Sequence, residues 1–507
     1  MRQAACNVPD KLAVVDSNQQ LTWGEWDSQI NRVANALIDS GLQANDRIAI
    51  LSPNCVEYLS VFAGSLRAGV CVAPLSSLAS AETLAAMIND SEAKLLFVSS
   101  DYWELIAPQL NQLTRLQPNG VIILKGEQSV YPTYKDFIRD AGEQAPELES
   151  ADRLDGEFNL IYSSGTTGTP KGILHDRRYR ARENQDLSAM GCFHPDTRTL
   201  ISTPLYSNTT LFTVFPTLAA GGTLYLMEKF DTTRFLQLSQ QHAINHTVLV
   251  PVQYARLLKA ADFDQYDLSA YQIKYSTSAP LHQNTKKEIL ARWPAGGLVE
   301  IYGMTEGGVV CALAAHEFPD KLDTVGCPVA DCDLKIIDPQ GNELPQGEVG
   351  EVIGRNRKMM RGYVNRPEAT AHASWYDGEG RRYHKSGDIG WLDSDGFLHL
   401  LDRKKDMIIS GGFNIYAVDL ENALLAQPSV QEAAVIGVPS EQWGETPVAF
   451  VVADQDQMIE PEALRTKVNA SLGKAQRIAE IRLVDELPRS PIGKVLKRAL
   501  RDDYAAS

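Results

Sequence analysis

Apolar residues in the first hundred positions alternate between helical and strand spacing. Between residues 21 and 42, Trp26, Ile30, Val33 and Leu37 recur every three or four positions, which predicts an amphipathic helix. Short apolar runs typical of buried strands follow at 46–52, 70–75 and 93–99. Helical patterns separate these runs, at 56–68 and 81–89. Strands alternating with helices predict a parallel or mixed α/β sheet.

A second series of the same kind starts near residue 159. Its expected strands lie at 159–163, 199–203, 223–227, 246–251, 273–277 and 298–302. Between about 321 and 401, short strands are separated by turn residues such as Pro345 and Gly347, which predicts a small β-rich unit. After Asp402, the alternation of helices and strands returns at 418–426, 430–438, 447–453 and 461–470.

These patterns predict an α/β multi-domain fold. We expect a large N-terminal domain, residues 1–401, and a small C-terminal α+β domain, residues 402–507. The large domain should contain two α/β sheet subdomains, about 1–158 and 159–320, and a small β-barrel-like subdomain, 321–401. The length of 507 residues agrees with this division, because one hydrophobic core rarely exceeds roughly 250–300 residues.

Composition narrows the class of protein. The formal net charge of −16 argues against nucleic acid as a partner, since such proteins need a basic surface to neutralise phosphates. The seven cysteines form no Cys-x-x-Cys pair, so neither a zinc site nor a disulfide framework is indicated. No apolar stretch has the length of a signal peptide or a membrane span, and we expect a soluble cytoplasmic protein. A homodimer is left open.

A loop rich in glycine and hydroxyl residues follows the expected strand 159–163. Its candidate phosphate-binding residues are Ser163, Ser164, Gly165, Thr166, Thr167, Gly168 and Lys171. Glycine lets backbone N–H groups approach a phosphate closely, hydroxyls add donors, and lysine adds a positive charge. The alternative is an ordinary flexible turn, which this full composition disfavours. The loop is not a Walker A motif, because Lys171 lies between a proline and a glycine.

Five later blocks accompany this loop. They are Tyr302-Gly-Met-Thr-Glu-Gly307, Arg361-Gly-Tyr-Val-Asn-Arg-Pro-Glu-Ala-Thr370, Lys385-Ser-Gly-Asp-Ile-Gly390, the block 402–415, and Pro488-Arg-Ser-Pro-Ile-Gly-Lys494. In sequence and order they resemble the adenylate-forming superfamily, which includes acyl-CoA and aryl-CoA synthetases, peptide-synthetase adenylation domains and beetle luciferases. The resemblance covers nearly the whole chain. It implies an ATP-dependent ligase that first forms an acyl-adenylate and then a thioester.

The resemblance also implies roles for the residues of these blocks. The loop 163–171 would hold the β- and γ-phosphates of ATP, and Glu306 with Ser163 would bind Mg²⁺. Asp388 and Arg403 would bind the ribose. The adenine would lie against Ser278, Ala279, Pro280 and Tyr302. Lys494 would bridge the substrate carboxylate and the α-phosphate, with Thr305 as a further catalytic candidate.

The C-terminal domain is implied to be mobile. Asp402 matches the family's hinge position, and Gly411 and Gly412 would line the tunnel for the pantetheine arm of coenzyme A. Trp443 is a candidate for the coenzyme A end of that tunnel, with packing on its own domain as the alternative. The implied cofactor and co-substrates are Mg²⁺, ATP and coenzyme A.

The acyl pocket departs from the family in one place. Ser207 stands where many members have a gating histidine, which indicates a wider or more polar pocket. The expected pocket residues are Tyr206, Ser207, Asn208, Val250, Tyr254, Ser276, Thr277, Gly303, Met304 and Val309. Their mixture of apolar, aromatic and hydroxyl groups favours an aromatic or medium-sized acid over a long alkyl chain or an amino acid.

Three functions follow from these features. The leading one is an AMP-forming acid–CoA ligase. The second is a stand-alone adenylation enzyme that loads the phosphopantetheine of a separate carrier protein. The third is a nucleotide-binding sensor without turnover, which the joint presence of Lys171, Glu306, Asp388, Arg403 and Lys494 disfavours. Nothing in the sequence supports a luciferase-like oxidation.

Overall fold

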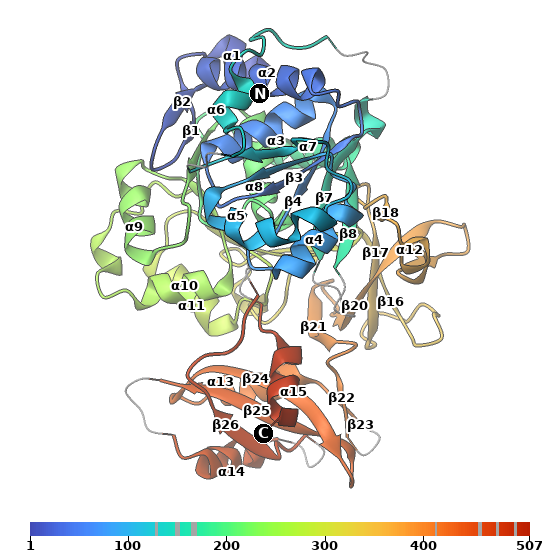
Figure 1. The fold of residues 1–507 in the computed structure, drawn as a ribbon. Helices are drawn as coiled ribbons and strands as arrows, with labels where there is room; N and C mark the ends of the chain where they lie inside the picture. Colours follow the sequence, from blue (N-terminus) through green and yellow to red (C-terminus); the bar gives the residue numbers. More distant parts are fainter. Residues whose placement is uncertain are drawn as a thin grey trace.

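The structure is a computed structural model. It describes residues 1–126, 130–147, 153–163, 170–410, 413–454, 459–472, 476–490 and 494–506. A large N-terminal body carries three sheets, and a smaller C-terminal body, at the bottom of Figure 1, carries a fourth. No helix in the described ranges has both the length and the apolar character needed to cross a lipid bilayer.

The first sheet has seven strands in the order β18-β8-β7-β4-β3-β5-β6. Their bounds are β3 (Arg47–Leu51), β4 (Cys71–Pro74), β5 (Leu95–Val98), β6 (Val121–Ile123), β7 (Glu157–Ser163), β8 (Lys171–Asp176) and β18 (Gly362–Tyr363). The five strands from β7 to β6 are parallel, and β8 and β18 add antiparallel pairs at one edge. The predicted mixed sheet is therefore confirmed.

Both faces of the first sheet are buried. Successive side chains of a strand point to opposite faces, and here they enter two separate cores. In β3, Ile48 and Ile50 join one core while Ala49 and Leu51 join another. The first core also contains α2 (Trp23–Asp39) and α3 (Val56–Ala68), and the second contains α4 (Ala81–Asp90) and the end of α5 (Ser100–Ile106).

The second sheet has nine strands in the order β15-β14-β13-β12-β11-β9-β10-β1-β2. Their bounds are β1 (Leu12–Val15), β2 (Gln20–Thr22), β9 (Arg198–Ile201), β10 (Thr223–Leu226), β11 (His246–Leu249), β12 (Ile273–Ser276), β13 (Gly297–Gly303), β14 (Val310–Ala314) and β15 (Cys327–Pro328). Helices α7 (Arg177–Ala189), α8 (Asn208–Ala219), α9 (Thr232–Gln241), α10 (Pro251–Lys259) and α11 (Gln283–Arg292) connect the later strands. The short helices α1 (Arg2–Asn7) and α6 (Tyr134–Ile138) pack beside α2.

The boundary expected at residues 158 and 159 does not separate these two sheets. Strands β1 and β2, from the first 22 residues, pair beside β10 in the second sheet, whereas β7 and β8 join the first. Phe62 of α3 and Phe215 of α8 pack with ring centroids 5.4 Å apart in a core shared by both sheets. An apolar pattern predicts that a strand forms, but it does not tell which sheet the strand joins.

The third sheet is antiparallel and follows the expected change of pattern. Its strands are β16 (Asp333–Ile337), β17 (Gly350–Arg355), β19 (Ser374–Tyr376), β20 (Arg382–Leu392) and β21 (Leu398–Arg403). The long β20 pairs with β17, β19 and β21, and α12 (Pro367–His372) precedes β19. The ladders of the described strands leave this sheet open, so the β-rich unit is present without the barrel closure that we expected.

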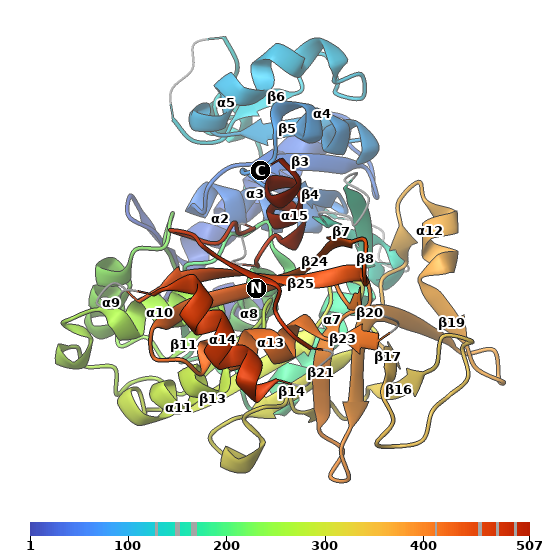
Figure 2. The same ribbon diagram turned by 90° about the horizontal axis from the view of Figure 1, so that it is seen from below.

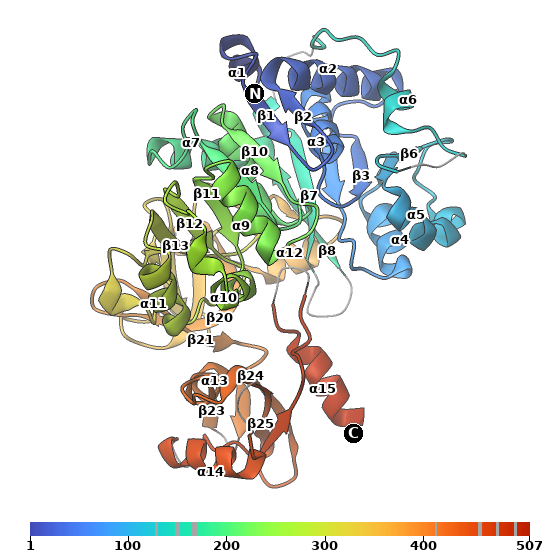
Figure 3. The ribbon, with the colours of Figure 1, turned by 90° about the vertical axis from the view of Figure 1, so that its left-hand side faces the viewer.

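The C-terminal body has a five-stranded sheet covered by helices on both faces. Its elements are β22 (Ile408–Ser410), β23 (Phe413–Ile415), α13 (Ala417–Leu425), β24 (Val430–Ser440), β25 (Gly444–Ala453), α14 (Pro461–Ser471), β26 (Glu480–Leu483) and α15 (Lys497–Ala506). Helices α13 and α14 cover one face and α15 the other. Seen from below, β24 and β25 cross in front of the N-terminal body, and α14 lies at the end far from it (Figures 2 and 3).

Candidate active site

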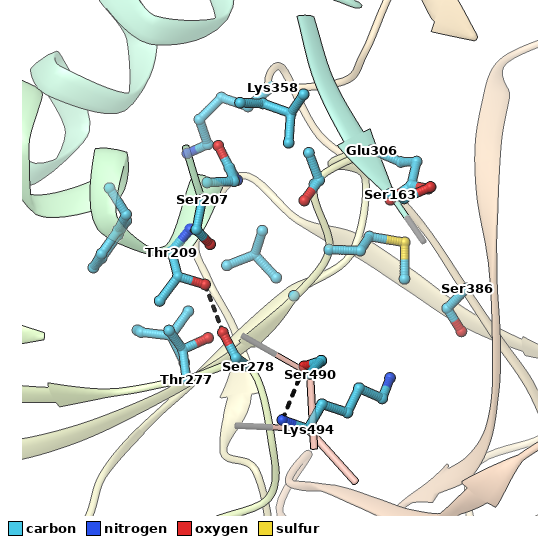
Figure 4. A pocket seen from close by; sticks show the side chains of 18 of the residues that line it. Ser163, Ser207, Thr209, Thr277, Ser278, Glu306, Lys358, Ser386, Ser490 and Lys494 are labelled. Carbon is cyan, nitrogen blue, oxygen red and sulfur yellow. Dashed lines mark hydrogen bonds between the residues drawn. The ribbon is translucent and has the colours of Figure 1, made fainter. Parts of the chain in front are cut away.

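A cavity of about 1350 Å³ is lined by both bodies of the protein. Residues from the ends of β7 and β13 contribute to its wall, as do the loop after β12 and the segment that precedes α15. In Figure 4, Ser163 and Glu306 lie on one flank, Ser207, Thr209 and Ser278 on the other, and Lys494 at one end. Ligands of α/β sheets commonly bind at the carboxyl ends of the strands, and this cavity is in that position.

Three residues expected at the nucleotide form one hydrogen-bonded group. The hydroxyl of Tyr302 donates to one oxygen of Asp388 over 2.6 Å, and Nε of Arg403 lies 3.0 Å from the other oxygen. Residues 388 and 403 face each other in the β20–β21 ladder, which fixes the arginine beside the carboxylate. Burial raises the pKa of Tyr302 well above its usual range, and the Asp388 charge adds to the shift, so the phenol stays a donor.

This arrangement differs in part from the expected adenine wall. Arg403 and Ser278 line the cavity. Tyr302, whose hydroxyl bonds Asp388, lies behind the cavity wall and does not line it. The described wall also lacks Ala279, Pro280 and Asp388. Ser278 has a φ of +77°, which a side-chain-bearing residue rarely adopts. Such strained positions cluster at functional sites.

The expected phosphate and metal residues converge on Tyr363, which the sequence reasoning missed. Its hydroxyl donates to Glu306 Oε1 over 2.8 Å, and the ammonium of Lys171 lies 5.2 Å from the centre of its ring. Tyr363 belongs to the block 361–370, so the signal was present without an assigned role. Ser163 lines the same part of the cavity, while Ser164, Gly165, Thr166, Thr167 and Gly168 lie outside the described residues.

A buried histidine holds the backbone beside Glu306. Nε2 of His175 lies 2.6 Å from the carbonyl oxygen of Thr305, and its other nitrogen lies 3.4 Å from the Asn159 amide. Burial, with the nearby Arg180 charge, lowers the pKa of His175 to about 3. The ring is therefore neutral, and Nε2 carries the proton that it donates to Thr305.

The donor set at Glu306 fits a magnesium ion bound mainly by phosphate. No group of three or more His, Cys, Asp or Glu residues that could hold a metal occurs in the described part of the chain. Mg²⁺ usually takes one or two protein carboxylates together with substrate phosphates and water, so a single carboxylate beside Lys171 is sufficient.

Lys494 enters the cavity from the segment that precedes α15. Its backbone N–H donates to the side-chain oxygen of Ser490 over 3.1 Å, and the N–H of Ser490 returns a 2.7 Å bond to the carbonyl of Lys494. In Figure 4 the side chain extends away from Ser490 into the pocket. Burial, followed by the charge of Arg403, lowers the pKa of Lys494 to about 8. A cation thus stands at the end of the cavity that Arg403 shares.

Six of the ten expected acyl-pocket residues line the cavity. They are Tyr206, Ser207, Asn208, Thr277, Gly303 and Met304. The other four, Val250, Tyr254, Ser276 and Val309, are buried away from it. Tyr254 packs in the core of the second sheet and donates to the carbonyl of Tyr275 over 2.9 Å.

The period of a strand explains two of these errors. Tyr275 and Thr277 line the cavity, so Ser276 between them points to the opposite face. In the same way Val310 and Ala312 face the cavity while Val309 packs on Val352 in a separate core. The sequence reasoning also missed the apolar wall formed by Leu187, Met190, Phe212, Tyr275, Val299, Ile301, Val310 and Ala312.

The expected hinge residue lies at the junction of the two bodies. The carboxylate of Asp402 accepts the backbone N–H of Arg403 over 2.7 Å and that of Ala417, the first residue of α13, over 2.8 Å. Trp443 is 51% exposed in the turn between β24 and β25 and does not line the cavity. Gly411 and Gly412 lie outside the described residues.

Comparisons with known proteins cover nearly the whole chain. The model of the AMP-binding enzyme family matches residues 1–364, and that of the AMP-binding enzyme C-terminal domain matches 419–494. The chain is 31% identical to 4-coumarate–CoA ligase 2 of Nicotiana tabacum over 97% of its length and 91% of the relative's. It is 32% identical to feruloyl-CoA synthase of an Amycolatopsis species over 97% of this chain and 96% of the relative's. The crystal structure of ATP-bound MatB from Rhodopseudomonas palustris superposes with a TM-score of 0.89 at 29% identity, covering 99% of this chain and 98% of that one.

Proposed function

The chain belongs to the AMP-binding enzyme family, and from this premise we propose that it is an AMP-forming carboxylic acid–CoA ligase acting on an aromatic acid. One observation carries the proposal. A single cavity is lined by the cations Lys494 and Arg403, by the carboxylate of Glu306 and by an apolar wall. Charged groups for a nucleotide and its metal ion therefore share one space with a chamber for an acyl group.

In the first step a carboxylate oxygen attacks the α-phosphorus of ATP. A new P–O bond forms, the bond to the β-phosphate oxygen breaks, and pyrophosphate leaves. Negative charge spreads over the phosphoryl oxygens, so catalysis depends on positioning and on cations placed beforehand. Lys494 would neutralise the carboxylate and the α-phosphate as they meet, and Lys171 would bind the leaving phosphates.

Glu306 and Ser163 would hold Mg²⁺, which when bound neutralises charge on the leaving pyrophosphate. The carboxylate is oriented for this role from two sides. Tyr363 donates to Oε1 over 2.8 Å, and His175 fixes the adjoining carbonyl of Thr305 over 2.6 Å. Neither contact uses Oε2 of Glu306. Asp388, held by Tyr302 and Arg403, would accept the ribose hydroxyls.

In the second step the thiolate of coenzyme A attacks the acyl carbon. The C–S bond forms, the bond to the phosphate oxygen breaks, and AMP leaves with that oxygen. Lys494 fills one end of the cavity in the present arrangement, so the C-terminal body would turn about Asp402 to admit the thiol.

The wall of the chamber supports an aromatic acid. Phe212, Tyr275 and Ile301 line it together with the hydroxyl and amide groups of Ser207 and Asn208. Flat apolar surfaces bury an aromatic ring well, while the few polar groups orient it. The two relatives are named for 4-coumarate and feruloyl substrates, which are acids of the same class.

The test is pyrophosphate release measured across benzoic, cinnamic and straight-chain acids, with coenzyme A, with a phosphopantetheinylated carrier protein, and with neither. We expect release to depend on an aromatic acid and the thioester to form on coenzyme A. Thioester formation on the carrier alone would favour the second function named from the sequence. If none of these acids causes pyrophosphate release, the ligase proposal is refuted.

A further inference from the structure

A group of four charged residues lies on the cavity wall far from Lys494. The ammonium of Lys358 is 2.5 Å from Asp186 and 3.4 Å from Asp331, and the guanidinium of Arg357 is 3.2 Å and 3.5 Å from the same two carboxylates. In Figure 4 Lys358 lies at the end of the pocket opposite Lys494. Nothing in the adenylation chemistry above uses this charged group.

The side chain of Lys358 is largely shielded from solvent, and its ammonium still has one donor to offer. Its side chain is 11% exposed, compared with 59% for Arg357. An ammonium carries three donors, and the two aspartates account for two of them. Among the described residues no third acceptor for Nζ is recorded, and Lys358 borders the cavity.

The position of Lys358 is fixed by the backbone next to Glu306. Gly307 pairs with Met359 in an isolated bridge, and the N–H of Gly308 donates to the carbonyl of Lys358 over 3.3 Å. Gly307 has a φ of +72°, and a Cβ there would overlap the carbonyl oxygen of Lys358. Only glycine allows this close approach, so the lysine is held rigidly relative to the predicted metal carboxylate.

On the basis of the proposed function, we propose that Lys358 determines specificity by donating a hydrogen bond to a neutral oxygen at the end of the acid distal to its carboxyl group. A phenolic hydroxyl or an ether oxygen meets this requirement. The group of four is electrically neutral, with two cations and two carboxylates. A second carboxylate on the substrate would add an unpaired charge in a partly buried place, which is costly.

Recognition of this kind discriminates strongly. A site built to bond a substrate hydroxyl rejects the analogue that lacks it, because one N–H of the Lys358 ammonium then loses water without gaining an acceptor, while the two aspartates still hold the other two. A hydrogen bond from a charged donor corresponds to about 10- to 100-fold in kcat/KM. An acid without the distal oxygen would still bind the apolar wall, but it would react that much more slowly.

The experiment compares 4-hydroxycinnamic, cinnamic and 4-carboxycinnamic acids by pyrophosphate release in the wild type and in Lys358→Met. We expect the wild type to prefer the hydroxylated acid to cinnamic acid by about 10- to 100-fold. The variant should lose most of this preference while its kcat/KM for cinnamic acid stays within about threefold. Lys335→Met is the matched control, because that lysine pairs with Glu343 and does not line the cavity.

Each outcome separates the two proposals. An unchanged preference in Lys358→Met, or equal losses for all acids, overturns the role of Lys358 while the ligase stands. A wild-type preference for the dicarboxylic acid overturns the neutral-oxygen class. A wild type that releases no pyrophosphate with any aromatic acid overturns the proposed function and this inference with it. If Lys358→Met does not fold, Lys358→Gln, which keeps a donor, should give an intermediate preference, and an unaltered one overturns the inference.

Discussion

Replacing Lys494 should separate the two half-reactions. The ammonium lies in the cavity beside Arg403, where it would meet the carboxylate and the α-phosphate. Removing one preorganised electrostatic donor from an active site typically costs about 10²- to 10³-fold in rate. We therefore expect Lys494→Ala to lose that much adenylation. Thioester formation from supplied acyl-adenylate should stay within about twofold, since the lysine takes no part in that step.

The pKa of Lys494 gives the same prediction a pH dependence. Its usual value is 10.5, and burial lowers it to about 8, because burial disfavours the charged form. The side chain is then about 90% protonated at pH 7 and about 10% at pH 9. If the protonated form is required, kcat/KM for adenylation falls about tenfold between pH 7 and pH 9. Arginine stays charged throughout, so the profile of Lys494→Arg should be flat over this range.

The assay uses each half-reaction alone. Acid-dependent pyrophosphate–ATP exchange reports adenylation from pH 6.5 to 9.5, and thioester absorbance reports the reaction of coenzyme A with synthetic acyl-adenylate. Lys497→Ala is a useful comparison, because that lysine is three residues further along, at the start of α15, and pairs with Glu421 at 2.9 Å. Equal losses of both half-reactions in Lys494→Ala, or a fall with pH that persists unchanged in Lys494→Arg, would refute the assigned role.

Three further changes test other parts of the structure. Asp402→Pro, which fixes φ at the expected hinge, should slow thioester formation at least tenfold more than adenylation, measured with the same two assays. Tyr302→Phe removes the 2.6 Å bond to Asp388. It should raise the KM for ATP about tenfold and leave kcat within about twofold, as measured by initial rates. A change in kcat alone would contradict a role in binding ATP. Burial lowers the pKa of Lys274 from 10.5 to about 7. Between pH 7 and pH 10.5 the unfolded chain therefore binds more protons than the folded one, so this lysine makes the free energy of unfolding rise with pH in that range. Lys274→Met removes this titration together with the bonds from the ammonium to the carbonyls of Ala295 and Gly296. Its Tm relative to the wild type should therefore be most favourable near pH 7 and progressively less favourable toward pH 10. By calorimetry, an equal Tm difference at both pH values would contradict this.

The elements of the fold could be predicted because their signals are local. The helix expected at 56–68 occurs as Val56–Ala68, where a continuous apolar pattern ends at Gly69, whose φ of +85° forms the helix cap. The resemblance of the blocks to a known family likewise predicted one shared site for Glu306, Arg403 and Lys494, and all three line the same cavity. Each of these inferences needs only a short window of sequence or a resemblance of short blocks.

The rest could not be predicted because it depends on contacts distant in sequence. Lys358 meets Asp186 across 172 positions, and neither residue stands in a pattern that indicates the other. The error at Ser276 has a different cause: Ser276 and Thr277 are consecutive, and successive side chains of a strand point to opposite faces, so only one of them could line the cavity. Tyr363 was inside a quoted block, yet its bond to Glu306 becomes apparent only when β18 is placed beside β8.

Glu306, on the flank of the cavity, and Lys358, at the end far from Lys494, are linked through one short stretch of backbone. Glu306, the predicted metal carboxylate, is followed by Gly307, which pairs with Met359 next to Lys358, the proposed reader of the distal end of the acid. Met360 also donates its N–H to the carbonyl of Glu306 over 2.8 Å, so the two strands are joined on both sides of the glycine. A substrate bound by Lys358 would therefore be held in a fixed position relative to the segment that carries the predicted metal carboxylate. Closely packed groups transmit displacements to one another. Binding of the distal oxygen by Lys358 would therefore also improve the position of the reacting groups, and its loss would lower kcat as well as raise KM.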